Sequence, residues 1–325
     1  MSVLVTGGAG YIGSVVVERL LDRGEQVVVL DNLSRGYADA VPSPAHLVIG
    51  DICDREILHS LFRDHDVRAV MHFAAFSLVG ESVEQPEIYY RNNVTGSLTL
   101  IEAALAAGVE RLIFSSSGAV YGNLAPCPIR ETAAARPINP YGETKLAVER
   151  ALEWLHRAHR WTYFALRYFN AAGATEQHGE RHQPETHLIP RVLMAAAGET
   201  DGVAVLGDDY ATPDGTCIRD YVHVEDLAEA HILTLQAPAQ TSGSFNVGTG
   251  RGHSVRELIA AVRKVTARPV REIPGPRRSG DPAELVADPS KIQQTLGWQP
   301  QQDLESILRS AWTFKLRHGA SPRSS

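Results

Sequence analysis

The stretch VLVTGGAGYIGS, residues 3–14, decides the fold of this chain. A short apolar run of strand type is followed by glycines at Gly7, Gly10 and Gly13, and a helical pattern begins near Tyr11. Glycine at these positions permits a tight turn and lets the backbone approach a pyrophosphate at the helix N-terminus. The pattern therefore predicts a dinucleotide-binding turn; the alternative is an ordinary strand–turn–helix.

An aspartate at the end of the next apolar run, EQVVVLD (25–31), supports this prediction. Asp31 would accept hydrogen bonds from the adenosine ribose hydroxyls and would repel a 2′-phosphate, which favours NAD over NADP. In the other interpretation Asp31 only caps a helix. Asp51, at the end of a later run, either meets the adenine or caps the helix that follows it.

Apolar runs and helical patterns alternate through the first half of the chain. The expected strands are 2–6, 25–31, 46–50, 68–74, 111–116 and 162–169, and the expected helices are 12–24, 54–63, 86–107 and 141–158. Strands that alternate with helices indicate a parallel sheet with right-handed crossovers. The sequence thus predicts an α/β protein with a Rossmann-type doubly wound parallel sheet.

The regular alternation of strands and helices ends after Asn170, where a polar stretch is followed by shorter elements. They are a helix at LIPRVLMAAAG, a strand at VAVLG, a helix at EDLAEAHILTLQA, a strand at GSFNVGTG, a helix at 254–267 with a Ser254–Glu257 capping box, a proline-rich loop at 271–284 and a helix at 303–317. We therefore expect an NAD-binding domain at 1–170 and a smaller α/β substrate domain at 171–325. Some segments of the second domain are expected to pack back on the first.

Composition narrows the class of protein. The 325 residues are 44% hydrophobic and 21% charged, which is typical of a globular protein, and the net charge of −7 argues against a nucleic-acid or anionic-membrane binder. Three cysteines without paired spacing indicate neither a disulfide framework nor a zinc site. Without an apolar run of about 18 residues or a signal-peptide pattern, we expect a cytosolic protein.

The stretch NPYGETK (139–145) carries the candidate chemistry, because it sets Tyr141 and Lys145 one helical turn apart. A tyrosine with a pKa of about 10 is a poor base at pH 7, but a nearby cation favours its phenolate. With the positive nicotinamide ring, Lys145 would help Tyr141 act as a general base for an alcohol. Ser117, in the serine run after an expected strand, is the third candidate; the alternative for all three is ordinary helix and turn structure.

These residues together resemble the extended short-chain dehydrogenase/reductase family, and within it the UDP-glucose 4-epimerases. The resemblance covers nearly the whole chain, through stretches that include GDICD, YYRNNVTGSLTLIEA, FSSSGAVYG, LRYFNAAGA, GTCIRDYVHVEDLAEAH and RRSGDPAELVADPSK. It implies bound NAD, a UDP-sugar substrate and a catalytic trio of Ser117, Tyr141 and Lys145. Arg219 and Arg278 suit a UDP pyrophosphate, which is bound well by guanidinium groups.

The resemblance also implies a set of binding residues. Those for the cofactor are Gly7, Gly10, Tyr11, Ile12, Gly13, Asp31, Asn32, Asp51, Ile52, Phe73, Ala74, Ser77, Asn92, Ser115, Tyr141, Lys145, Tyr168 and Phe169. Those for the substrate are Ser117, Tyr141, Asn170, His187, Leu188, Ala204, Leu206, Arg219, Tyr221, Arg278, Asp281 and Leu285. Three positions depart from the family pattern: Ser77 replaces a lysine, His187 replaces an asparagine, and Leu285 stands where tyrosine or smaller residues occur.

The implied reaction is the interconversion of UDP-galactose and UDP-glucose through transient oxidation at C4, rotation of a 4-keto intermediate and return of the hydride. A 4-epimerase of another UDP-sugar (an N-acetylhexosamine, a pentose or a uronate), a net dehydrogenase and a non-catalytic NAD-binding protein are alternatives. A nucleotide-sugar dehydratase is disfavoured because Gly118 and Ala119 stand where such enzymes carry an Asp-Glu pair.

Two further expectations concern partners. No metal site is expected, because His178, His182 and His187 lie in a polar loop without a supporting carboxylate pattern and solvated histidines are the simpler interpretation. A homodimer is expected through the helices at 86–107 and 141–158, as is common in the family.

Overall fold

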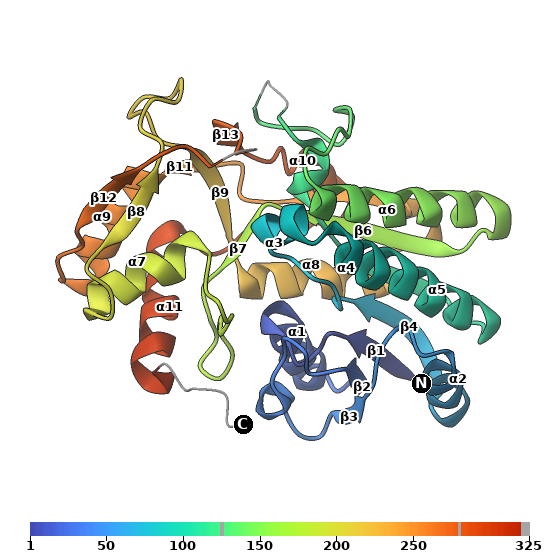
Figure 1. Ribbon diagram of the computed structural model, residues 1–325. Coiled ribbons are helices and arrows are strands. Elements are labelled where there is room, and N and C mark those ends of the chain that lie inside the picture. Colours follow the sequence, from blue (N-terminus) through green and yellow to red (C-terminus); the bar gives the residue numbers. More distant parts are fainter. Residues whose placement is uncertain (124–126, 279–280, 320–325) are drawn as a thin grey trace.

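A seven-stranded parallel sheet forms the centre of the computed structural model, which describes residues 1–123, 127–278 and 281–319 (Figure 1). Its strands, in spatial order, are β10 (Gly243–Val247), β6 (Thr162–Tyr168), β5 (Arg111–Ser117), β4 (Val67–His72), β1 (Ser2–Thr6), β2 (Gln26–Asp31) and β3 (His46–Ile49). The strand order reverses between β1 and β4, and ligands of such sheets bind beyond the strand ends at that point. The predicted Rossmann-type fold is confirmed.

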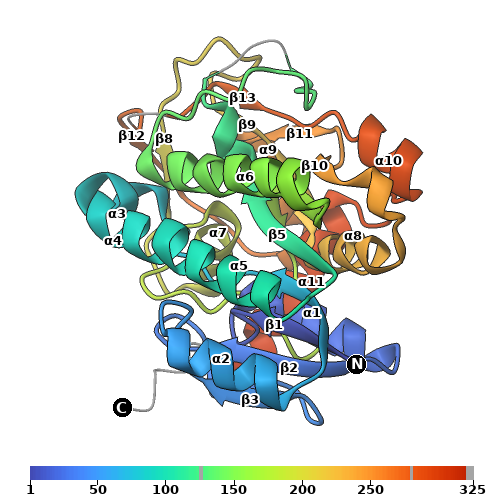
Figure 2. The ribbon, with the colours of Figure 1, turned by 90° about the vertical axis from the view of Figure 1, so that its right-hand side faces the viewer.

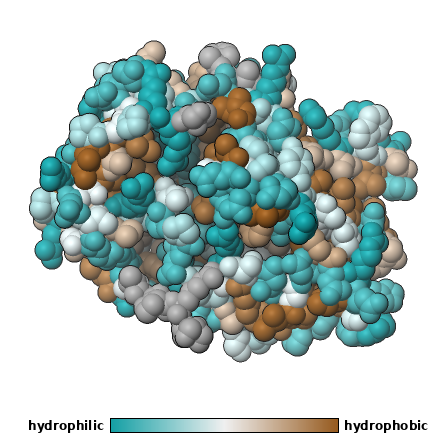
Figure 3. Space-filling model, in the orientation of Figure 1, coloured by the Kyte–Doolittle hydropathy of each residue, from teal (hydrophilic) through white to brown (hydrophobic). Residues whose placement is uncertain are grey.

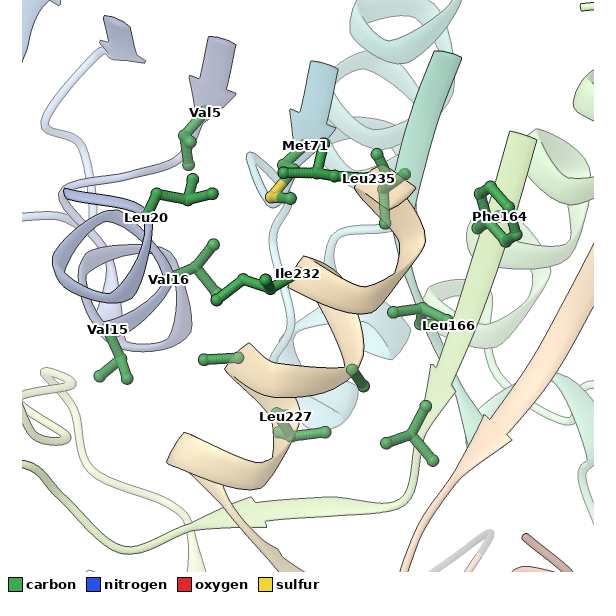
Figure 4. Close-up of a cluster of buried hydrophobic side chains, with 14 of the residues drawn as sticks. Val5, Val15, Val16, Leu20, Met71, Phe164, Leu166, Leu227, Ile232 and Leu235 are labelled. Atoms are coloured by element: carbon green, nitrogen blue, oxygen red, sulfur yellow. The ribbon is translucent and has the colours of Figure 1, made fainter. Parts of the chain in front are cut away.

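Helices cover both faces of this sheet, which explains why its inner strands are continuous apolar runs. α1 (Tyr11–Asp22) and α8 (Val224–Gln236) lie on one face, and α2 (Arg55–Asp64), α5 (Ser97–Ala106) and α6 (Pro140–His159) lie on the other (Figure 2). Figure 4 shows Val16 of α1 beside Ile232 of α8 and Leu20 of α1 beside Val5 of β1, all in one buried cluster. This packing fixes the N-terminus of α1 at the end of β1.

The second half of the chain adds elements to the large sheet and to the helices that cover it. α8 packs on α1, β10 pairs with β6, and α10 (Ser290–Leu296) packs on β10. α8, β10 and α10 thus come after the proposed domain boundary at residue 170 but pack on or pair with the large sheet of the first domain.

The remaining elements build a smaller unit on the left of Figure 1. α7 (Leu188–Ala197), α9 (Val255–Thr266) and α11 (Leu304–His318) share an apolar cluster with β8 (Val203–Leu206), which pairs with β12 (Glu272–Gly275). β9 (Ile218–His223) pairs with β7 (Asn170–Ala172), β11 (Gly252–Ser254) and β13 (Glu284–Leu285). The capping box is confirmed, because Ser254 and Glu257 each accept the other's backbone amide, at 3.0 and 2.8 Å.

Three sequence expectations differ from the structure. The helix expected at 86–107 is divided into α4 (Pro86–Tyr89), the π-helical turn η2 (Tyr90–Gly96) and α5. The stretch 271–284, expected to be a loop, contains β12, and the strand β9 was not predicted. Both strands pair only with segments that are distant in sequence, so local pattern gives little signal for them.

The other short elements are α3 (Val79–Glu84), η1 (Ala38–Ala40), η3 (Gly118–Tyr121) and η4 (Ala239–Thr241). Among the described residues, no helix combines the length and the apolar character that crossing a membrane requires.

Candidate active site

The turn between β1 and α1 leaves no room for side chains at two of its glycines. Gly7 has φ +75°, and a Cβ there would lie 2.5 Å from the backbone nitrogen of Ala74. A Cβ on Gly13 would lie 2.2 Å from the carbonyl oxygen of Gly7. The N-cap of α1 is Gly10, which has no side chain to cap the helix. The turn thus presents backbone amides at a helix N-terminus, which fits the pyrophosphate of a dinucleotide.

Asp31 is held at the edge of this turn by two backbone amides. Its Oδ2 accepts from the nitrogen of Ala9 at 3.0 Å, and its Oδ1 accepts from the nitrogen of Leu33 at 2.9 Å. Burial raises the pKa of Asp31, while these two hydrogen bonds act in the opposite direction. The carboxylate is therefore held at the cavity by two backbone amides, and its contact with the adenosine ribose stays a proposal.

Asp51 resolves one of the open alternatives. The N-cap of α2 is Asp54, whose side chain accepts from Glu56 and Ile57, so Asp51 is not that cap. Asp51 instead accepts a hydrogen bond from the Nδ2 of Asn32 at 2.8 Å. Asn32 lines the cavity described below, so Asp51 contributes to the cavity through Asn32. Its contact with the adenine stays a proposal.

A cavity runs along the carboxyl ends of β1, β2, β4 and β5 and collects most of the predicted cofactor residues. Those that line it are Gly7, Gly10, Tyr11, Ile12, Gly13, Asp31, Asn32, Ile52, Phe73, Ala74, Ser77, Asn92, Ser115, Tyr141, Lys145 and Tyr168. Of the predicted set, Asp51 and Phe169 are not among the lining residues, and Phe169 packs in an apolar cluster with Tyr121 and Leu146 instead. The residues present fit NAD.

Sequence reasoning missed two parts of this cavity. Arg35 lines it, with its guanidinium 2.5 Å from Glu81 and 5.3 Å from the ring of Phe76. The segment between β7 and α7 also lines it, with residues 177–179 and 181–184. Arg35 follows Asp31 closely in the sequence, but the segment is brought there only by tertiary structure.

Three contacts hold the segment between β7 and α7 against the nucleotide side. The Tyr11 hydroxyl donates to the carbonyl of Gly173 at 2.6 Å, and the Tyr37 hydroxyl donates to the carbonyl of Arg181 at 2.9 Å. The guanidinium of Arg181 lies 3.9 Å from the ring centroid of Tyr37. Figure 1 shows this segment lying beside α1. Its residues 177–179 and 181–184 form one side of the cavity lining.

The structure brings Ser117, Tyr141 and Lys145 together. α6 begins after its N-cap Asn139, so Tyr141 and Lys145 share one face, with the Lys145 Nζ 5.8 Å from the Tyr141 ring centroid. Ser117 ends β5, and its side chain lies near enough to the phenol of Tyr141 to favour a lower pKa of that group. The Lys145 Nζ donates to the carbonyl of Ser115 at 2.7 Å. The group has the arrangement of a general base with a supporting hydroxyl and ammonium.

The pKa values in this group do not follow the expectation that Lys145 favours the phenolate of Tyr141. Burial raises the pKa of Tyr141, and the nearby Ser117 side chain acts in the opposite direction. Burial also lowers the pKa of Lys145 to about 7, against the opposing effect of Glu149. The protein alone therefore does not make Tyr141 a phenolate, and the charge of an oxidised nicotinamide would have to contribute most of the stabilisation.

A buried polar network supports Lys145 from the next turn of α6. Glu149 accepts from Arg167, with Nη2 and Oε2 2.5 Å apart, and from the hydroxyl of Ser116. Arg167 also donates to the hydroxyl of Tyr121 at 2.8 Å. The i+4 spacing of Lys145 and Glu149 was the only available sequence signal for this network.

Four predicted substrate residues converge on the small sheet around β9. Leu285 of β13 lies opposite Arg219, and Asn170 of β7 lies opposite Tyr221. Arg219 also approaches Asp281, with Nη2 and Oδ1 3.7 Å apart.

The other predicted substrate residues come from different places. Ala204 and Leu206 lie on β8, His187 is the N-cap of α7, Leu188 is its first residue, and Arg278 is exposed. Their shared contact with a UDP-sugar stays a proposal.

The expectation of solvated loop histidines was wrong. His178 is 5% exposed. His187 Nδ1 lies 2.6 Å from Glu180 and 2.9 Å from Glu185, and His182 Nδ1 lies 3.0 Å from Glu180. A supporting pair of carboxylates is therefore present, although the sequence pattern was interpreted as lacking one.

Comparisons with known proteins agree with this geometry. Residues 3–248 match the model of the NAD dependent epimerase/dehydratase family. The chain belongs to this family. A UDP-glucose 4-epimerase from Halalkalibacterium halodurans is 51% identical over 324 residues, which is 98% of this chain and 96% of that protein. The family resemblance inferred from the sequence is confirmed.

Solved structures of relatives have the same fold. The UDP-glucose 4-epimerase from Brucella ovis in complex with NAD has a TM-score of 0.92 at 48% identity, over 96% of this chain and 97% of that one. The one from Stenotrophomonas maltophila, with bound NAD and formylated UDP-arabinopyranose, has a TM-score of 0.93 at 42% identity, over 98% of each chain. The family is NAD-dependent, as the cavity indicates.

Proposed function

We propose that the chain is an NAD-dependent 4-epimerase that interconverts UDP-galactose and UDP-glucose. The observation that carries the proposal is the convergence of Ser117, Tyr141 and Lys145 at the end of β5, beside the cofactor cavity. Curated relatives that match nearly the whole chain are named UDP-glucose 4-epimerases, which supports the same sugar class.

In the proposed mechanism, Tyr141 takes the proton of the sugar 4-hydroxyl, and Ser117 donates a hydrogen bond to the same oxygen. NAD, when bound, supplies the acceptor and donor of the C4 hydride. Lys145 keeps the phenol in place and contributes its charge when protonated. The 4-keto sugar then turns its other face to the cofactor, and Tyr141 returns the proton to give the inverted configuration.

The substrate is proposed to lie between this trio and the sheet around β9. Arg219 and Arg278 would bind the diphosphate, and His187 would donate to it in place of the family's asparagine. Gly118 and Ala119, which follow Ser117 in η3, carry no acid or base for dehydration.

A UDP-pentose is the second candidate substrate. Leu285 is smaller than the tyrosine of some family members, and the Stenotrophomonas relative was solved with a UDP-arabinopyranose derivative. An N-acetylated sugar also depends on the room beside Leu285. The pocket shape, and not the trio, decides among these sugars.

An assay with separate sugars tests the function. The purified protein is incubated with UDP-galactose, UDP-N-acetylgalactosamine and UDP-arabinose in turn, and each 4-epimer is measured. We expect UDP-glucose from UDP-galactose, without stoichiometric release of NADH. Net NADH formation would instead identify a dehydrogenase.

The matched variant is Tyr141→Phe, which keeps the ring and removes the proton acceptor. We expect turnover to fall by roughly 10²–10⁴-fold while UDP-sugar binding survives. Near-normal turnover in this variant would refute the assignment of Tyr141 as the base. A Ser60→Ala change on α2, away from the trio, serves as the control.

We also propose a cytosolic homodimer. The surface formed by α3, α4, η2, α5 and α6 exposes apolar side chains that a partner helix pair would cover. They include Val83, Tyr90, Leu98 and Trp154, which are 61%, 46%, 36% and 67% exposed. Apolar groups lie among polar ones on this side of the molecule (Figure 3).

A further inference from the structure

The segment ERHQPETH, residues 180–187, repeats the motif Glu-x-His on either side of Gln183 and Pro184. The chain folds back between the two copies, so that their side chains meet. One ligand atom from each of the four residues lies within 4.8 Å of every other. The four are Glu180, His182, Glu185 and His187.

The contacts within this cluster centre on two atoms. Glu180 Oε1 lies 3.0 Å from His182 Nδ1 and 2.6 Å from His187 Nδ1. His187 Nδ1 also lies 2.9 Å from Glu185 Oε1. Tetrahedral zinc with bonds of about 2.0–2.1 Å sets neighbouring ligand atoms about 3.3 Å apart, so the three short contacts would lengthen by roughly 0.3–0.7 Å and the more distant pairs, which lie within 4.8 Å, would draw together.

The surroundings suit a cation that enters from one side. The carboxylates of Glu180 and Glu185 are 11% and 12% exposed, while His187 is 41% exposed. The segment is fixed by the contacts of Tyr37 and Arg181, and Arg181 also pairs with Asp39 at 3.1 Å. The cluster is therefore partly preorganised, and its two carboxylates would balance the charge of a divalent ion.

We infer that Glu180, His182, Glu185 and His187 bind one divalent transition-metal ion of the zinc class. Two imidazole nitrogens and two carboxylate oxygens match the ligand preferences of Zn²⁺ and Co²⁺. Mg²⁺ and Ca²⁺ prefer sites made entirely of oxygen. His187 is also assigned to the substrate diphosphate, so the metal site shares one residue with the proposed substrate site; metal binding is therefore measured on the sugar-free protein, and this readout does not depend on epimerase turnover.

The ion would stabilise one side of the cofactor cavity. His182 lines the cavity, and the chain that leads from β7 to residues 180–187 is bound to Tyr11 through the carbonyl of Gly173. A bound ion would join the two halves of the segment and hinder its opening. NAD should consequently leave the metal-loaded protein more slowly than the chelator-treated protein.

Direct binding measurements test the site. Untagged full-length protein is treated with a chelator, dialysed at pH 8 and titrated with Co²⁺ by absorption spectroscopy and with Zn²⁺ by calorimetry. We expect one ion per chain, the intense visible bands of tetrahedral Co²⁺, displacement of Co²⁺ by Zn²⁺, and no competition from Mg²⁺.

Single variants locate the ion. His182→Asn and Glu185→Gln should each weaken Zn²⁺ binding by roughly tenfold or more, since even residues that only support metal ligands cost about 10–100-fold. His59→Asn, which changes an exposed histidine of α2, should bind as the wild type does. Circular dichroism checks that each variant is folded.

Two results would overturn the inference. One is the absence of saturable Zn²⁺ binding by the wild type at millimolar metal. The other is equal binding by the wild type and both cluster variants, which would place the ion elsewhere. In either case the cluster is a network of ion pairs between histidines and glutamates. Neither result bears on UDP-galactose turnover, so failure of this site and failure of the proposed reaction are distinguishable.

Discussion

Lys145 and Tyr141 show how burial and charge compete at single residues. Both are desolvated, so the pKa of the phenol rises and that of the ammonium falls to about 7. An ammonium that loses its proton near neutrality supports a phenolate less than an exposed lysine would at the same distance. The buried carboxylate of Glu149 partly restores the charge of Lys145. The pair therefore needs the positive charge of oxidised NAD for its proposed role.

The acidity of Lys145 predicts a pH dependence of stability. Its pKa is about 10.4 in the unfolded chain and about 7 in the folded, cofactor-free protein, so between these values the unfolded chain binds more protons. The free energy of unfolding should rise with pH above 7, by up to about 1 kcal/mol between pH 7 and 8. Chemical denaturation of the wild type and of Lys145→Met measures this difference.

The control is Lys264→Met, an exposed lysine on α9 that pairs with Glu305. It should have the same pH dependence as the wild type. If Lys145→Met also follows the wild type from pH 7 to 9, the ammonium of Lys145 has an ordinary acidity and the argument about the pair fails.

At the scale of elements, the predictable parts were those with local signals. The turn after β1, the strands β1, β2, β5 and β6, and the helix α6 are each specified by their own periodicity or glycines. The π-helical turn η2 lacks such a signal: Asn93 makes it a junction by accepting from the nitrogen of Phe76 and donating to Thr144 of α6. Such contacts, like the pairing of β9 and β12, exist only in the folded chain.

The turn between β1 and α1 yields the prediction at this scale. In Gly13→Ala the new methyl group would meet the carbonyl of Gly7 at 2.2 Å, so α1 must shift away from the turn. We expect at least a tenfold loss of NAD affinity and a loss of stability of about 1–3 kcal/mol, typical of overpacking. Cofactor content after purification and NAD titration measure the first effect, and thermal unfolding measures the second.

Gly80→Ala in α3 is the matched control, because a Cβ at Gly80 has open space around it. NAD affinity near that of the wild type in Gly13→Ala would mean that the turn does not need its present geometry to bind the cofactor.

At the scale of the whole molecule, the candidate site draws on regions far apart in sequence. The cofactor residues from the strand ends were predictable because parallel strands place their carboxyl ends at one edge. The segment at 177–184 was not, because only the return of the chain from β7 brings it to Tyr11 and Tyr37. The carboxylates beside His182 and His187 are local in sequence, but the sequence does not show that the chain folds back to bring the four side chains together. The tertiary course of the chain therefore determines the part of the site that local sequence patterns do not predict.

The proposed homodimer is the last prediction. Leu98 lies on α5 and is 36% exposed, and a charge there would be buried in the proposed interface at high cost. Leu98→Glu should shift the protein from dimer to monomer in size-exclusion chromatography with light scattering. Leu316→Glu, the same change at a 64% exposed leucine of α11, should leave the mass unchanged. A wild type that is monomeric at micromolar concentration, or a Leu98→Glu variant that stays dimeric, would remove this surface from consideration.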